Sequence, residues 1–216
     1  MLLHISKSVV AGRCFHRNGL LIHRTRNLLL CERLFGMATA PPEPDERGET
    51  PDYFDILGVD RAFTQSSDEL KSKYKRLMIE FHPDRHALSA EEEKVHNASM
   101  ATNVTRAYGV IGDPLSRALH LLELRGAAIE ESDSSIIDNN LLTEIMEVRE
   151  EIEDASSDNE LRALLLTCHE RQSKLYEKLV SAFREERIED AKSDTAKLQY
   201  WNRVEETIKE KISSIR

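Results

Sequence analysis

The sequence is poor in the residues that interrupt helices. Its 216 residues include only eight glycines and six prolines, and aromatic side chains make up 6%. Charged residues, in contrast, make up 32%. This composition is typical of a helical protein with little β-sheet. Long apolar runs are also absent: no stretch approaches the roughly 20 residues that a transmembrane helix needs, so we expect no membrane span.

Cysteine and net positive charge are scarce as well. Cys14 and Cys31 lie near the N-terminus, which leaves Cys168 as the one cysteine of the remaining sequence. A lone cysteine cannot form an internal disulfide. The lack of a CxxC pair excludes a cysteine-based zinc site. The formal net charge of −9 argues against a nucleic-acid-binding protein, because binding phosphates needs a basic face.

The first 40 residues differ from the rest in charge. They hold six basic residues and one acidic residue, so they carry +5 and the remainder carries −14. A basic, acid-poor segment with interspersed apolar residues is typical of a mitochondrial transit peptide, and a disordered basic arm is the alternative. Arginines interrupt every candidate for the apolar core of a secretory signal. We expect a transit peptide at 1–40 and a Pro-rich, flexible linker at 41–51.

Two helices are predicted directly after the linker. Asp52 is a candidate N-cap for a short helix, which Gly58 ends. A second helix is expected to begin at Ser67 or Asp68 and to end at Pro83, because the residue before a proline is pushed out of the α region. Spacings of four, three and four residues place one apolar stripe on this helix. The stripe consists of Leu70, Tyr74, Leu77 and Phe81.

A third helix is predicted from about residue 91 to 111. It would run antiparallel to the second helix, across a loop of about eight residues, to form a helical hairpin. Its apolar stripe consists of Ala101, Val104, Tyr108 and Ile111. Asp113 and Pro114 then provide the N-cap and the first turn of a fourth helix, which ends at Gly126.

The last 80 residues predict three further helices, at about 136–155, 158–184 and 190–213. Short polar joints between them favour an antiparallel three-helix bundle. Cys168 lies on the apolar stripe of the second of these helices, so a buried structural cysteine is favoured over metal or redox chemistry with His169. The whole fold is therefore expected to be all-α.

The tripeptide His82-Pro83-Asp84 opens the loop of the helical hairpin. His82 and Asp84 form a possible acid/base couple, but such a couple needs a pocket and further polar groups. A metal site needs three or four ligands, and the nearby His86 and His96 lack a metal-binding spacing. A plain turn and a docking point for another protein are the remaining interpretations.

The residues around this tripeptide resemble the J-domain of DnaJ-type co-chaperones. The resemblance rests on residues 52–59 (DYFDILGV), on Leu70, Tyr74 and Leu77, on His82-Pro83-Asp84-Arg85, on Ala107-Tyr108 and on Asp113-Pro114. It implies a J-domain at 52–126 whose HPD loop docks on a DnaK-type chaperone and triggers its ATP hydrolysis. It also implies that an acidic surface of the chaperone binds the basic residues of the second helix. The implied chaperone-binding residues are Lys71, Lys73, Lys75, Arg76, His82, Pro83, Asp84 and Arg85.

The C-terminal half resembles one branch of that family. Residues 113–126 (DPLSRALHLLELRG) and 138–154 (DNNLLTEIMEVREEIED) look like HscB, the J-protein of iron–sulfur cluster assembly, called Jac in fungi. The resemblance covers roughly residues 52–213, and it implies a scaffold-binding bundle at 127–216. Some animal members carry two CxxC pairs ahead of the J-domain. This chain has none, so no metal site or cofactor is implied.

Helix geometry indicates a possible partner site on the bundle. The core stripe of the first bundle helix consists of Ile137, Leu141, Ile145, Val148 and Ile152, that of the second of Leu161, Leu165, Cys168, Leu175, Leu179 and Phe183, and that of the third of Trp201, Val204, Ile208 and Ile212. At 100° per residue, Leu142 and Met146 lie roughly 100–140° from the middle of the first stripe, and Tyr200 lies roughly 90° from that of the third. A broader core face is one interpretation, and an exposed apolar patch rimmed by charge is the other. In HscB proteins, the positions that match Leu142, Met146, Glu147, Arg149, Glu150 and Tyr200 hold the cluster scaffold IscU. Thr143 departs from the larger apolar residue usual in bacterial members.

Three functions remain to be separated. The favoured one is an adaptor in the mitochondrial matrix, with no enzymatic activity of its own, which brings IscU to a mitochondrial DnaK-type 70-kDa heat-shock chaperone. A general folding co-chaperone would bind unfolded clients, yet neither a Gly-rich nor a zinc-finger client region is visible. An enzyme that uses His82 and Asp84 would need a second catalytic constellation, which the sequence lacks.

Overall fold

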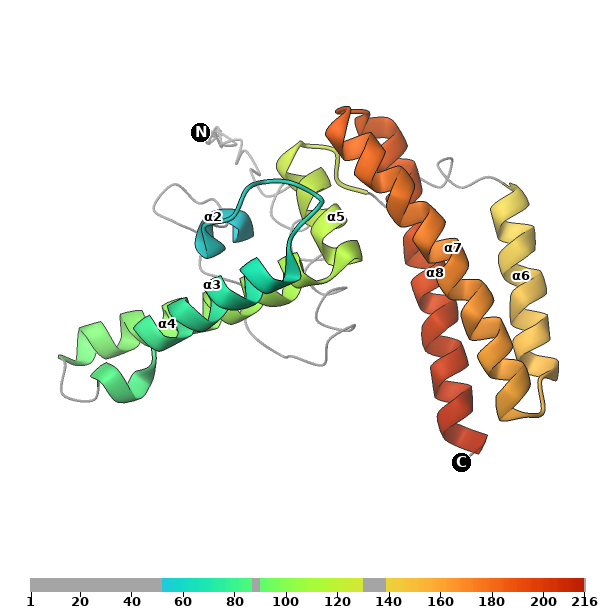
Figure 1. The fold of residues 1–216 in the computed structure, drawn as a ribbon, viewed down its shortest axis with the longest axis horizontal. Helices are drawn as coiled ribbons and strands as arrows, with labels where there is room; N and C mark the ends of the chain where they lie inside the picture. Colours follow the sequence, from blue (N-terminus) through green and yellow to red (C-terminus); the bar gives the residue numbers. More distant parts are fainter. Residues whose placement is uncertain (1–51, 87–89, 130–138, 216) are drawn as a thin grey trace, which may run out of the picture. The chain divides into compact units, whose positions relative to one another are not determined.

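The computed structural model describes residues 52–86, 90–129 and 139–215 (Figure 1). The expected transit peptide and linker at 1–51 lie outside the described residues. Within the described ranges every regular element is a helix, in agreement with the all-α prediction, and no helix is long and apolar enough to cross a membrane. The elements are α2 (Tyr53–Leu57), α3 (Ser67–Glu80), the 3-10 turn η1 (Pro83–His86), α4 (Glu91–Gly112), α5 (Pro114–Leu124), α6 (Asn139–Asp154), α7 (Asp158–Arg184) and α8 (Ile188–Ile215).

The short helix α2 begins and ends as predicted. The side chain of its N-cap, Asp52, accepts a hydrogen bond from the Phe54 amide at 2.8 Å. Gly58 ends the helix in the left-handed region at φ 64°, where a residue with a Cβ is disfavoured. Phe54 and Leu57 are buried, so this five-residue helix is held by tertiary packing rather than by its length.

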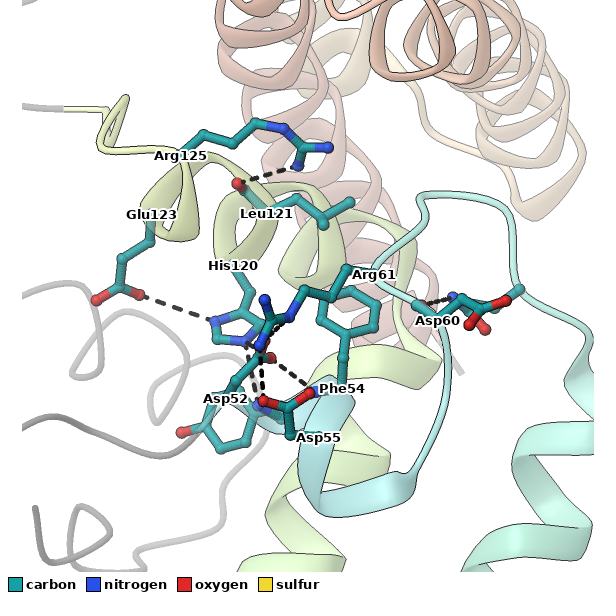
Figure 2. Close-up of polar contacts among 11 residues, drawn as sticks. Asp52, Phe54, Asp55, Asp60, Arg61, His120, Leu121, Glu123 and Arg125 are labelled. Carbon is teal, nitrogen blue, oxygen red and sulfur yellow. Dashed lines mark hydrogen bonds and ion pairs between the residues drawn. The ribbon is translucent and has the colours of Figure 1, made fainter. Parts of the chain in front are cut away.

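A polar cluster around the buried side chains of Asp52 and His120 fixes α2 against α5 (Figure 2). Oδ1 of Asp52 lies 3.1 Å from Nε2 of His120, and Oδ2 lies 2.5 Å from Nε of Arg61. The His120 ring packs on Tyr53 and Phe54, with ring centroids 4.7 Å and 5.7 Å apart. Asp52 therefore caps its own helix and also binds the following loop and a helix almost 70 residues further along the chain.

The helical hairpin forms from α3 and α4, as predicted. Ser66 caps α3 by accepting a hydrogen bond from the Glu69 amide. Of the expected stripe, Leu70 is buried and the other three side chains are half-buried against the core. Tyr74 stacks on Tyr108 of α4 at 4.3 Å between ring centroids. The helix ends at Glu80, slightly before the proline, and the loop contains the 3-10 turn η1, which was not predicted.

The helix α5 follows directly after α4. It starts at Pro114, with the Asp113 side chain accepting from the Ser116 amide at 2.7 Å. It ends at Leu124, and Gly126 follows at φ 70°, so the predicted stop at this glycine is confirmed as a left-handed turn. Arg117 is buried, and its guanidinium donates hydrogen bonds to the carbonyls of Ile111, Gly112 and Phe63. One side chain thus joins the end of α4 to the loop between α2 and α3.

The helices α6, α7 and α8 form the C-terminal bundle (Figure 1), and its core lies on the predicted faces. The buried side chains from these faces are Leu141, Ile145, Ile152, Leu161, Cys168, Leu175, Leu179, Phe183, Trp201, Val204 and Ile208. Val148, Leu165 and Ile212 are half-buried, and Ile137 lies outside the described residues. Ser157 and Glu160 form a capping box, which fixes the start of α7 at the predicted residue 158.

One aromatic side chain from the N-terminal half packs against the bundle. Phe63, in the loop between α2 and α3, is buried between Tyr176 and Phe183 of α7, with ring centroids 5.2 Å and 5.1 Å away. The guanidinium of Arg117 lies 5.7 Å from the Phe63 ring centroid. The guanidinium of Arg125 lies 5.5 Å from the Phe183 ring centroid. The buried residues of the two halves therefore belong to one continuous core.

Candidate functional site

The HPD loop presents His82 and Asp84 to solvent. Their side chains are 51% and 91% exposed, and Nδ1 of His82 lies 3.7 Å from Oδ2 of Asp84. The Asp84 amide donates a hydrogen bond to this Nδ1 at 3.2 Å. Because Nδ1 accepts this hydrogen bond, it carries no proton in the neutral imidazole, whose N–H is then on Nε2. The loop thus offers a half-exposed imidazole beside an exposed carboxylate.

Two residues behind the tripeptide tie the loop to the end of α3. Arg85 donates from Nη1 to the Ile79 carbonyl at 3.2 Å, and Nε2 of His86 lies 2.9 Å from the Glu80 carbonyl. The last carbonyls of a helix have no partner within the helix, so these side chains act as a C-terminal cap. Arg85 was expected to contact the chaperone, and here it also has a role in holding the loop.

The basic residues of α3 do not all share one face. Lys71, Lys75 and Arg76 are exposed, and no carboxylate among the described residues pairs with them. Lys73 is half-buried instead, with Nζ 3.1 Å from Oε1 of Glu69 and hydrogen-bonded to the Gly58 carbonyl. Helix geometry places Lys73 about 160° from Lys75. The exposed basic surface therefore comprises three of the four cations that the sequence indicated.

The loop lies apart from a cavity that the described residues form. No group of three or more His, Cys, Asp or Glu residues in the described ranges is placed to hold a metal ion. A cavity of about 330 Å³ lies elsewhere, where Asp113 and Pro114 face His169, Tyr176 and other residues of the bundle, and no loop residue lines it. Burial raises the pKa of Cys168 to about 12, which fits a structural thiol rather than a nucleophile.

The predicted patch on the bundle has an exposed apolar centre. Leu142 is 40% exposed and Met146 is 63% exposed, so both lie outside the core of their helix, as their spacing indicated. Tyr200 is half-buried and packs against the core. Arg149 and Glu150 are exposed on α6.

Two contacts fix the register of α6 against α8 and bring the patch together. Lys211 of α8 donates from Nζ to the carbonyls of Ile152 and Glu153, at the end of α6. Both helices rise about 1.5 Å per residue in the same direction, so Tyr200, eleven residues before Lys211, lies level with residues 141 and 142. Tyr200 also points within about 20° of the direction of Lys211, on the side that faces α6.

Contacts through α7 give the same register. Arg171 pairs with Glu144 of α6 at 2.6 Å, and Gln172 donates to Asn202 of α8 at 3.0 Å. Because α7 is antiparallel to α6, Gln172 is level with residue 143 of α6, one residue before Glu144. Asn202 is therefore 59 positions after its counterpart on α6, which places Tyr200 level with Leu141 and next to Leu142.

One predicted member of the patch points elsewhere. Glu147 lies about 140° around α6 from Leu142. It is on the flank toward α7, as is Glu144, whose carboxylate binds Arg171. One residue that the sequence analysis missed lies beside the patch: the guanidinium of Arg203 covers the Tyr200 ring at 5.7 Å from its centroid. Arg203 follows Tyr200 by three residues on α8, a spacing that places two side chains next to each other on a helix, so the sequence could have indicated this contact.

Comparison with known proteins agrees with this two-part architecture. A family model described as the DnaJ domain matches residues 52–120, and one described as the HSCB C-terminal oligomerisation domain matches residues 137–209. The iron–sulfur cluster co-chaperone protein HscB of mouse is 33% identical over 80% of this chain and 71% of its own length. The human protein of the same name is 32% identical over the same shares.

Solved structures agree as well. The crystal structure of human co-chaperone protein HscB aligns with a TM-score of 0.71 and 32% identity, over 75% of this chain and 82% of that one. Chaperone HscB from Vibrio cholerae aligns with a TM-score of 0.68 and 26% identity, over 77% of this chain and 100% of that one. With both family models in the predicted order and relatives of this identity, the chain belongs to the HscB family of J-domain co-chaperones.

Proposed function

We propose that this chain is an adaptor of mitochondrial iron–sulfur cluster assembly. Its J-domain stimulates ATP hydrolysis by a 70-kDa DnaK-type chaperone in the matrix, and its bundle delivers the scaffold protein IscU to that chaperone. The observation that carries the proposal is the presence of two separate exposed surfaces, the HPD loop with its basic helix and the apolar patch on α6 and α8. The relatives named as iron–sulfur cluster co-chaperones support the choice of client.

The HPD loop suits a signalling contact rather than a chemical step. His82 and Asp84 are exposed, and the loop behind them is held by Arg85 and His86. The chaperone would contact the His82 imidazole and the Asp84 carboxylate in a fixed arrangement. The loop therefore loses little conformational freedom when the chaperone binds. Lys71, Lys75 and Arg76 attract an acidic surface over a longer range, which accelerates encounter and weakens as salt is added.

Substitution of the loop histidine tests the first surface. We expect His82→Gln to abolish stimulation of the chaperone ATPase, because glutamine does not reproduce the ring nitrogens. The melting curve should not move, since the side chain is half exposed and outside the core. His96→Gln, at an exposed histidine of α4, is the matched control and should stimulate normally. A His82→Gln protein that still stimulates the ATPase would refute the assigned role.

Truncation of the apolar centre tests the second surface. We expect Leu142→Ala with Met146→Ala to weaken IscU binding by at least about 2 kcal/mol, because binding energy concentrates in central apolar anchors. Basal stimulation of the chaperone should persist through the intact loop. Leu166→Ala is the control, because this α7 leucine is 65% exposed and lies on another face of the bundle. Unchanged IscU affinity in the double variant would remove the patch from the mechanism.

A general folding co-chaperone is the competing function. It predicts binding of unfolded segments as well as, or instead of, the folded scaffold. Titration of the chain with IscU and with a permanently unfolded reporter protein separates the two, since the adaptor binds only the first. Import into isolated mitochondria followed by sequencing of the mature N-terminus tests the location, and we expect cleavage between about residues 30 and 50.

A further inference from the structure

The arginines of the bundle divide into two groups by their partners. Those of the first group pair with carboxylates of the chain. Arg162 binds Asp158, Arg171 binds Glu144, Arg184 lies 3.8 Å from Glu185, and Arg187 binds Glu185 and Asp190. Arg149 and Arg203 form the second group, and no carboxylate within residues 52–86, 90–129 and 139–215 pairs with either.

Arg149 and Arg203 each have an acidic residue nearby on the same helix with which they form no ion pair. Glu153 follows Arg149 by four residues on α6, and Glu206 follows Arg203 by three residues on α8. These are the spacings at which side chains of opposite charge meet on a helix. The guanidinium of Arg203 instead lies over the ring of Tyr200. In a chain with a net charge of −9, two guanidinium groups without carboxylate partners call for an explanation.

Both arginines border the same apolar patch. Arg149 points within about 20° of Leu142 along α6, so it lies two turns further along the same face. Arg203 lies about 60° around α8 from Tyr200, on the side away from the direction of Lys211 and α6. The apolar centre therefore has one free guanidinium on its α6 side and another on its α8 side.

We propose that Arg203 is a specificity-determining residue of this patch, which together with Arg149 selects a partner surface that presents carboxylates on both sides of an apolar ridge. The inference rests on the proposed function and specifies the chemistry of the face that IscU would present. The Arg203 guanidinium lies over the Tyr200 ring, and no carboxylate among the described residues pairs with its N–H groups. These donors are available for a two-pronged contact with a carboxylate of the partner.

Charge removal at Arg203 gives the decisive measurement. We expect Arg203→Gln to weaken the affinity for IscU by about tenfold or more at low salt, the size expected for loss of a charge-assisted hydrogen bond. The dependence of the dissociation constant on salt should become shallower. Arg203→Met keeps an apolar cover on Tyr200 and should show the same loss. Arg203→Lys should be intermediate, because an ammonium keeps the charge but not the planar fork.

Arg162→Gln is the matched control. This arginine is also exposed and lies on α7, but it is already paired with Asp158. Its replacement should leave both the IscU affinity and the salt dependence unchanged. Melting curves of all the Arg203 variants should match that of the parent chain, since the side chain is exposed and outside the core.

The outcomes distinguish this inference from the proposed function. Failure of the parent chain to bind IscU would overturn the proposed function and this inference with it. If the parent binds and the Leu142/Met146 double variant does not, an Arg203→Gln protein with parental affinity and salt dependence would overturn only the role of Arg203. If Arg203→Gln does weaken binding, the charge-reversed variant Arg203→Glu can be tested against IscU variants in which single Asp or Glu residues are changed to Lys. We expect one of these IscU variants to restore binding.

Discussion

Replacement of Arg117 by methionine is the most informative test of how the J-domain is held together. Arg117 is 4% exposed and donates from Nε to the Ile111 carbonyl at 2.7 Å, from Nη2 to the Gly112 carbonyl at 3.3 Å, and from Nη1 to the Phe63 carbonyl. Methionine keeps most of the side-chain length and removes every donor. The buried carbonyls of Ile111 and Phe63 would then have lost their partner.

The expected loss of stability follows from those two carbonyls. A buried acceptor left without a hydrogen bond costs about 1–3 kcal/mol, so two of them cost about 2–6 kcal/mol. Part of this is offset, because burial of the guanidinium is itself unfavourable: desolvation is the main reason why the pKa of Arg117 is lowered. We expect a net loss of about 3 kcal/mol, or about 6–12 °C in Tm for a protein of this size.

Urea titration followed by far-ultraviolet circular dichroism measures this loss. Arg117→Lys should fall between the parent and the methionine variant, because one ammonium cannot reach all three carbonyls. Arg162→Met is the control, since the ion pair of this exposed arginine with Asp158 is screened by solvent and should contribute little to stability. An Arg117→Met protein within about 0.5 kcal/mol of the parent would show that the carbonyls find other donors, and it would refute the reasoning.

Two further predictions concern α7. Hydrogen bonds from the Ser156 and Ser157 amides lower the pKa of Glu160, so its capping box should stabilise the protein above the ordinary glutamate pKa and lose this effect as the pH falls through the lowered value. Thermal melting of Glu160→Gln should thus differ from the parent at pH 7 and converge with it in acid; a constant difference would contradict this. Cys168, with a pKa of about 12, should react with a thiol reagent at pH 8 only in denaturant, in a Cys14→Ser, Cys31→Ser background.

Features set by local chemistry could be predicted from the sequence. Asp52, Gly58 and Asp113 each determine a helix boundary through their own side chain or backbone preference, and all three boundaries were predicted. The start of α7 follows equally from Ser157 and Glu160. Apolar periodicity then identified the core faces, because a helix must bury its apolar stripe.

Features that depend on distant residues could not be predicted in this way. Lys73 resembles its basic neighbours in sequence, and only the fold shows that it reaches the Gly58 carbonyl. Arg117 lies in the first turn of α5, and the sequence does not show whether its side chain faces solvent or the core. Its burial depends on carbonyls from two other segments. The level of Tyr200 relative to Leu142 depends on the register between α6 and α8, which periodicity within one helix does not determine.

That register limits how the last helix can vary in length. Lys211 binds the end of α6, and Tyr200 lies eleven residues before it. A single deletion between them, with Lys211 kept in place, would turn the tyrosine by about 100° and move it about 1.5 Å along the axis. An insertion would do the same in the opposite direction. Among homologous sequences we therefore expect the segment between these positions to keep a constant length, even where most of its residues are exchanged.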